Sequence, residues 1–134
     1  MILITALVIL SFQTFANDFV DAYYAKVEEC IAFEKAKPDL TDNQVSLNEV
    51  KYLPLIRSLR IEDCSKAEET AYLNDIKTQG TELKATLSSY NKSDLSKLTE
   101  QELLLLEELN EKLQNYSLEV DLISIYEKLE VKQK

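Results

Sequence analysis

Glycine is almost absent from this chain. Of 134 residues only Gly80 is a glycine, and Pro38 and Pro54 are the only prolines. Glycine supplies the backbone conformations that many tight turns need, so a chain with so little of it is expected to be helical. The same scarcity excludes the loops that cradle phosphates in nucleotide-binding proteins, because these need several glycines at fixed offsets. The composition and length therefore predict an all-α fold in one domain.

Histidine is missing altogether. The serine and cysteine nucleophile systems depend on a histidine base, and histidine is the commonest protein ligand of catalytic zinc. Adjacent acidic residues occur, for example Glu62 with Asp63 and Glu107 with Glu108, but neighbours on a helix point about 100° apart and do not face each other across a substrate. We therefore expect no catalytic residues, no metal site and no cofactor. An enzyme built from carboxylates on distant helices is the least favoured interpretation.

Acidic side chains outnumber basic ones, 24 to 15, and the formal net charge is −9. A field of this sign repels a phosphate backbone, and the basic residues are dispersed along the chain rather than clustered. We therefore expect neither nucleic acid nor an anionic membrane surface as a partner.

The first residues have the pattern of a secretory signal. Residues 2–10 are apolar apart from Thr5, and Thr14 and Ala16 form a small-x-small cleavage site before Asn17. This predicts a signal peptide over 1–16 and a single mature domain over 17–134, exported to the periplasm or the extracellular space and without stable membrane insertion. The alternatives are a buried core segment or an uncleaved anchor. A bilayer span takes roughly 20 apolar residues, and Asp18 ends the stretch too early for one.

Export makes the two cysteines, Cys30 and Cys64, interpretable. Two cysteines in an oxidising compartment are expected to pair. A disulfide that closes so long a loop stabilises the folded chain by roughly 3 to 4 kcal/mol in the chain-entropy model. The alternatives are free thiols, or a metal site completed by two carboxylates.

Apolar residues spaced three and four apart predict a helix from Asp18 to Lys37, stopped by Pro38. The Ser-x-x-Glu sequence from Ser46 to Glu49 has the form of a capping box and predicts a short helix over 47–53. A further helix is expected over 54–63, with its proline tolerated in the first turn.

Two longer helices are predicted to follow, over 66–90 and over 99–131, the second opened by a capping box from Thr99 to Glu102. The seam of the first contains Gly80, which either allows a close approach of another helix or ends this one. The buried stripe of the second comprises Leu106, Leu109, Leu113, Tyr116, Val120 and Ile123. The whole is then a bundle of four to five helices with a long C-terminal helical hairpin, packed like a coiled coil, and the disulfide ties the first helix to the start of the third. Alternating polarity over 116–122 leaves a half-buried strand as the alternative there.

Four consecutive leucines, 103–106, cover the full circumference of one helical turn. A second apolar stripe runs beside the first and comprises Leu118, Leu122, Ile125 and Leu129. Either the C-terminal helix lies at the centre of the bundle, or it offers these side chains to a partner. In the second case the binding residues are expected to be Leu104, Leu105, Leu118, Leu122, Ile125 and Leu129.

The predicted function is therefore protein–protein interaction, as a subunit, adaptor, inhibitor or chaperone-like module, with another protein or a second copy as the partner. The alternative is a carrier of a small apolar ligand held between helices. Seven tyrosines are present, and they either line such a pocket or pack in the core and at its boundary.

Overall fold

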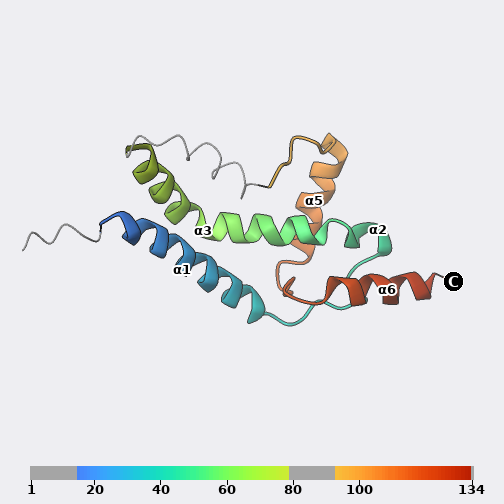
Figure 1. The fold of residues 1–134 in the computed structure, drawn as a ribbon. Helices are drawn as coiled ribbons and strands as arrows, with labels where there is room; N and C mark the ends of the chain where they lie inside the picture. The colour runs from blue at the N-terminus through green and yellow to red at the C-terminus, as the bar shows by residue number, and fades with distance from the viewer. Residues whose placement is uncertain (1–14, 79–92, 134) are drawn as a thin grey trace, which may run out of the picture.

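The computed structural model describes residues 15–78 and 93–133, and within these ranges the chain forms five helices and no strand. The helices are α1 (Phe15–Lys35), α2 (Leu47–Val50), α3 (Leu53–Thr78), α5 (Glu100–Lys112) and α6 (Leu122–Lys132) (Figure 1). The predicted all-α class is confirmed. The signal segment up to residue 14, and the part of the predicted seam that contains Gly80, lie outside the described residues. No described helix is both long and apolar enough to cross a bilayer.

Helix α1 lies alongside α3 (Figure 1). A disulfide between Cys30 and Cys64 joins the two helices. The pairing is as predicted. The place of Cys64 differs from the prediction, because this residue lies inside α3 rather than at the start of a helix. Helix α1 ends at Lys35, two residues before the predicted end.

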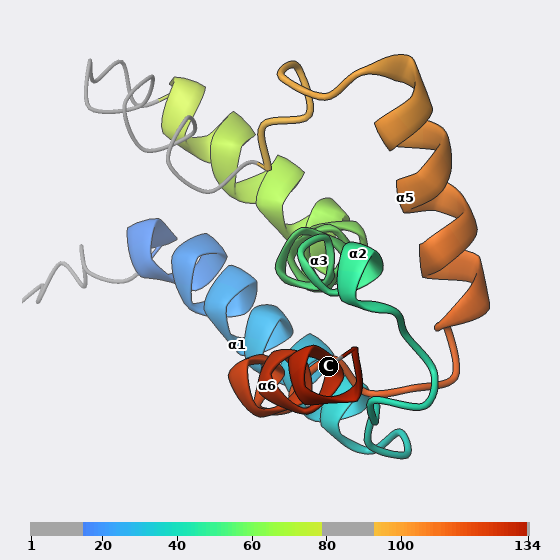
Figure 2. The same cartoon turned by 90° about the vertical axis from the view of Figure 1, so that its right-hand side faces the viewer.

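The predicted break between a helix over 54–63 and a helix over 66–90 is wrong, because one helix runs across it. Helix α2 stops at Val50, and α3 starts at Leu53 and continues past Asp63 to Thr78. Pro54 lies in the first turn, where proline is tolerated, and no proline or glycine falls between Asp63 and Thr78, so nothing local ends the helix there. Instead α3 bends near its middle (Figure 2). There the hydroxyl of Ser65 donates to the carbonyl oxygen of Ile61 at 2.8 Å, a bond that often accompanies bent helices.

Both predicted capping boxes form. The backbone N–H of Ser46 donates to Glu49 Oε2 at 2.7 Å. At the start of α5, the backbone N–H of Thr99 donates to Glu102 Oε2 at 3.0 Å, and Thr99 Oγ1 accepts from the backbone N–H of Glu102 at 3.2 Å. These reciprocal bonds satisfy amides that have no partner within the helix, which explains where α2 and α5 begin.

The predicted helix over 99–131 is interrupted, so the long C-terminal hairpin does not form as expected. Residues 113–121, called the linker below, leave the helix between α5 and α6. The linker backbone pairs with the chain just after α1: Ser117 N–H donates to the Pro38 carbonyl at 2.8 Å, and Leu40 N–H donates to the Ser117 carbonyl at 3.2 Å. The alternative of a half-buried strand holds only in part. Ser117 forms an isolated bridge with Asp39, but Ser117 and Leu118 are both buried, so buried and exposed residues do not alternate.

The hydrophobic core lies among α2, α3, α5, the linker and α6. Its most buried members are Leu53 and Ile56 of α3, Leu109 of α5, and Leu113 and Leu118 of the linker. Helix α5 crosses the first half of α3, while α6 packs against α2 (Figures 1 and 2).

The linker also resets the register of the last helix. Ile123, predicted on the buried stripe, is 72% exposed, whereas Ile125 and Leu129 face the core. The stripe that α6 buries is therefore the second of the two predicted stripes.

Candidate functional site

The two arginines of the chain both hold the linker from α3. Arg57 and Arg60 are three residues apart and so share one helix face. Arg57 forms a bidentate ion pair with the carboxylate of Glu119. Its Nε donates to Oε1, and its Nη2 donates to Oε2 at 2.9 Å. Arg60 Nη1 donates to the carbonyl oxygen of Tyr116 at 3.1 Å. The planar fork of arginine suits such paired contacts better than the ammonium group of lysine.

Glu34 of α1 is the buried anion at the centre of this arrangement, with only 3% of its surface exposed. It accepts hydrogen bonds from Arg60 Nη1 and Lys37 Nζ, both at 2.6 Å, and from the backbone N–H of Leu118 at 3.3 Å. Burial alone would raise the pKa of Glu34, but these hydrogen bonds and the Arg60 charge outweigh it and hold the pKa below its ordinary value.

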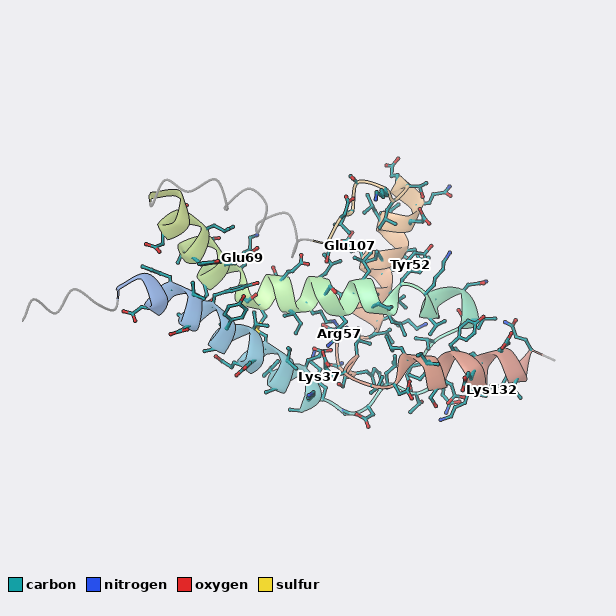
Figure 3. All side chains as sticks on the ribbon, in the orientation of Figure 1. Lys37, Tyr52, Arg57, Glu69, Glu107 and Lys132 are labelled. Carbon is teal, nitrogen blue, oxygen red and sulfur yellow. A yellow bond between two sulfur atoms is a disulfide. The ribbon has the colours of Figure 1, made fainter. Side chains whose placement is uncertain are left out.

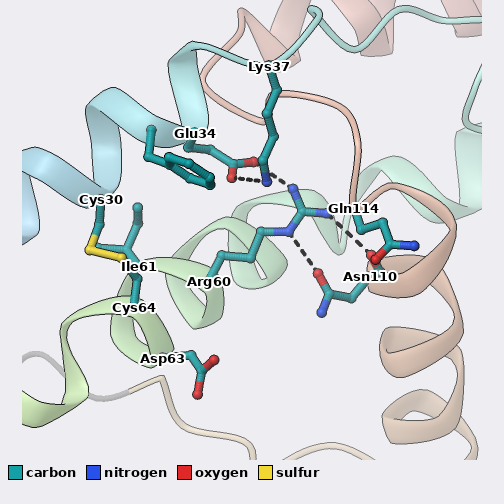
Figure 4. Close-up of a pocket in the computed structure, with 10 residues that line it drawn as sticks. Cys30, Glu34, Lys37, Arg60, Ile61, Asp63, Cys64, Asn110 and Gln114 are labelled. Atoms are coloured by element: carbon teal, nitrogen blue, oxygen red, sulfur yellow. Dashed lines mark hydrogen bonds and ion pairs between the residues drawn. A yellow bond between two sulfur atoms is a disulfide. The ribbon is translucent and has the colours of Figure 1, made fainter.

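Arg60 connects three parts of the fold. Besides its bonds to Glu34 and the linker, Nε donates to Asn110 Oδ1 at 2.8 Å and Nη2 donates to the Asn110 carbonyl at 3.3 Å (Figure 4). One guanidinium therefore ties α1, α5 and the linker to α3. Glu34 and Arg60 were not predicted as site residues. The available signal was that Glu34 lies one turn after Cys30, on the face of the first helix that packs against the rest of the protein.

These groups form part of the lining of a cleft of about 300 Å³ between α1, α3 and the end of α5 (Figure 4). It is lined by Cys30, Phe33, Glu34, Lys37, Arg60, Ile61, Asp63, Cys64, Asn110 and Gln114. Four of these ten residues are charged, and Arg60 donates hydrogen bonds to both Glu34 and Asn110. The polar groups of the cleft therefore serve to join helices. Among the described residues no group of His, Cys, Asp or Glu is placed to hold a metal ion.

The tyrosines do not gather around one pocket. Tyr23 of α1 stacks on Tyr72 of α3 with ring centroids 5.8 Å apart, and Tyr52 is buried in the core. Tyr126 lies on the exposed side of α6, and Tyr90 is outside the described residues. Their placement agrees with packing in and around the core.

The six predicted partner-binding residues do not form one surface. Leu118, Ile125 and Leu129 are buried in the core, and Leu105 and Leu122 are half-buried against it. Leu104 alone is exposed, by 56%, and the neighbouring Leu103 is exposed by 40%. Four consecutive residues on a helix face four directions, so Leu106 reaches the core while Leu103 and Leu104 face outward.

Glutamates surround the two exposed leucines. Counting along α5, Leu104 has Glu100 four residues before it and Glu107, Glu108 and Glu111 three, four and seven residues after it. Residues at these spacings share a helix face. All four glutamates are exposed, and in the described part of the chain none of them makes an ion pair or a side-chain hydrogen bond. We call the set Glu100, Leu103, Leu104, Glu107, Glu108 and Glu111 the acidic leucine face.

A second group of exposed apolar side chains lies on α6, where Ile123 and Val131 are each 72% exposed. The charges beside them are mixed, because Lys128 as well as Glu127 and Glu130 are exposed on this helix. This helix therefore differs from the acidic leucine face in its charge and not in its apolar character.

Comparison with known proteins assigns no family to the chain: no family model matches it, and no curated protein or solved structure matches it.

Proposed function

We propose that the protein acts by binding another protein, and that the acidic leucine face of α5 is the binding surface. The observation that supports this is the exposure of Leu103 and Leu104 among carboxylates that have no partner within the described residues. Burying such leucines against a partner is favourable in proportion to the apolar area removed from water.

The face is held rigidly, which favours binding because little order has to be created when a partner arrives. The opposite side of α5 is anchored by Leu106 and Leu109 in the core. The Tyr52 hydroxyl, where α2 meets α3 (Figure 3), donates to Glu102 Oε1 at 3.2 Å. At the other end of α5, Lys112 Nζ donates to both carboxylate oxygens of Glu49, at 3.0 and 3.2 Å.

We propose a binding role and not a catalytic one. The acidic leucine face carries only leucine and glutamate side chains, and the chain has no histidine to act as a general base beside it. The alternative role as a carrier of a small apolar ligand has less support, because the described cleft beside the disulfide is lined by charged residues that bond to one another.

We also propose that the protein works in an oxidising compartment after export. The disulfide between Cys30 and Cys64 is the support for this, since such bonds persist in secreted and periplasmic proteins. N-terminal sequencing of protein purified from its source is expected to begin at Asn17. A sequence that begins at Met1 would contradict cleavage.

The binding surface is tested by photo-crosslinking in the native host, with the photoreactive amino acid at position 104 or, as a control, at position 123, which is more exposed. We expect a discrete protein adduct from position 104 and none from position 123. The captured protein is then purified and titrated with variants. Leu104→Ser is expected to weaken binding about five- to fifteen-fold, the loss of roughly half the burial energy of a leucine. Ile123→Ser is expected to leave it unchanged. Equal effects of both changes, or no adduct at 104, would contradict the proposal.

A further inference from the structure

We infer that the partner presents a basic amphipathic helix to the acidic leucine face, with an apolar side chain seated on Leu104 and lysines or arginines around it. This inference rests on the proposed function and adds the chemistry of the partner. Three features of the structure lead to it.

The first is the arrangement of charge around the apolar centre. Glu100, Glu107 and Glu108 are the direct helical neighbours of Leu104. A side chain that covers Leu104 must therefore bring its own neighbours close to these carboxylates. Basic neighbours would form charge-assisted hydrogen bonds with them, whereas apolar or acidic neighbours would remove the carboxylates from water without compensation.

The second feature is that the described part of the chain, residues 15–78 and 93–133, supplies no cation to this face. The only basic residue of α5 is Lys112, and it is engaged with Glu49 on α2. Glu111 lies four residues after Glu107 and three after Glu108, spacings at which like charges destabilise a helix. The free protein therefore carries a repulsion on this face that a basic partner would relieve.

The third feature is the contrast with the exposed apolar surface of α6. Ile123 and Val131 on α6 are more exposed than Leu104, but Lys128 lies among the charges of that helix. A basic partner is thus attracted to α5 in preference to α6. The net charge of −9 attracts a basic partner over a longer range and speeds the encounter.

The inference is tested with a probe of defined chemistry: a synthetic amphipathic helix with leucines on one face and lysines on the other. A matched peptide has glutamine in place of every lysine. Binding to the full mature chain is measured by fluorescence anisotropy at low and at physiological salt. We expect the lysine peptide to bind, the glutamine peptide to bind at least tenfold more weakly, and the affinity of the lysine peptide to fall as salt is added.

The location of binding is tested with the triple variant Glu107→Gln, Glu108→Gln and Glu111→Gln. Glu100 is left in place because it stabilises the first turn of α5. Loss of three surface ion pairs is expected to weaken the lysine peptide about tenfold. The variant is expected to be at least as stable in urea as the unaltered protein, because the repulsion between these glutamates is removed, so weaker binding cannot be ascribed to unfolding.

The matched control is the triple variant Glu28→Gln, Glu127→Gln and Glu130→Gln, which has the same net charge and also changes exposed glutamates without ion pairs in the described structure. We expect less than a twofold change. Equal weakening by both triple variants would overturn the inference, since net charge alone would then explain binding. Equal binding of the glutamine peptide would also overturn it.

Failure of this inference is distinguishable from failure of the proposed function. If the protein crosslinked from position 104 binds the α5 triple variant as tightly as the unaltered chain, the surface is correct and the basic partner is wrong. If no adduct forms at position 104, the proposed function itself is wrong, and with it the inference.

Discussion

Replacing the carboxylate of Glu34 by an amide is expected to be far more damaging than its conservative size suggests. In Glu34→Gln, one oxygen can still accept from Arg60, but the amide NH₂ takes the place of the oxygen that accepts from Lys37, where it meets a second donor. The Arg60 side chain is only 12% exposed and loses its counter-charge. Removing one partner of a buried ion pair costs about 3 to 5 kcal/mol. Because Lys37 can turn toward water, we expect a loss near the lower end, about 3 kcal/mol.

Urea denaturation followed by circular dichroism measures this loss as a change in the free energy of unfolding. The control is Glu29→Gln on the same helix, where the carboxylate is 69% exposed and pairs with Lys26 at 3.1 Å. An exposed pair of this kind is expected to contribute less than about 0.5 kcal/mol. If Glu34→Gln destabilises the protein by no more than the control does, the reasoning about the buried network is refuted.

Three further outcomes are expected. The lowered pKa of Glu34 stabilises the folded chain fully above the pKa of about 4.3 for an unfolded glutamate, and this stabilisation is lost as the pH falls through the folded pKa. Glu34→Gln should therefore flatten the acid limb of the stability–pH curve. At the lowest pH the variant and the unaltered protein should not differ in stability. The double variant Cys30→Ser, Cys64→Ser removes the disulfide, whose cysteines are 34 residues apart in the sequence. It should lower the free energy of unfolding in urea by roughly 3 to 4 kcal/mol. An unchanged urea midpoint would argue against stabilisation by the disulfide. Leu113→Ala removes a fully buried side chain of the linker and should cost about 2 to 5 kcal/mol; a value near zero would mean that the linker does not close the core.

The features predicted correctly from the sequence are those that depend on nearby residues. The capping boxes at Ser46 and Thr99 are each contained in four residues, and both form. The first helix follows from its apolar spacing. The pairing of Cys30 with Cys64 needed only the count of cysteines and an oxidising environment.

The interruption of the C-terminal helix could not be predicted in this way, because the three-and-four spacing of apolar residues continues through the linker. No glycine or proline marks the break. It is stabilised from a distance, by the Pro38 carbonyl, by Arg57 and by Arg60. Helix propensity is a weak preference that such tertiary contacts overcome.

The exposure of some of the leucines follows from the sequence only if the helix buries one face. Four leucines in a row cover the full circumference of a helical turn, so such a helix exposes part of the run, and Leu104 is exposed. Which way Ile125 and Leu129 face depends on the register of α6, and the linker, which contains Leu118, sets that register. Periodicity within one helix does not contain this information.

The central structural claim is that the linker separates α5 from α6 and is held by the first half of the chain. Backbone NMR tests it directly, through the secondary chemical shifts of residues 113–121 and the hydrogen exchange of two linker amides. We expect non-helical shifts around Ser117 and slow exchange at the Ser117 and Leu118 amides. The Leu118 amide should exchange faster in Glu34→Gln, because Glu34 is its acceptor. Continuous helical shifts from Glu100 to Val131 would contradict the claim.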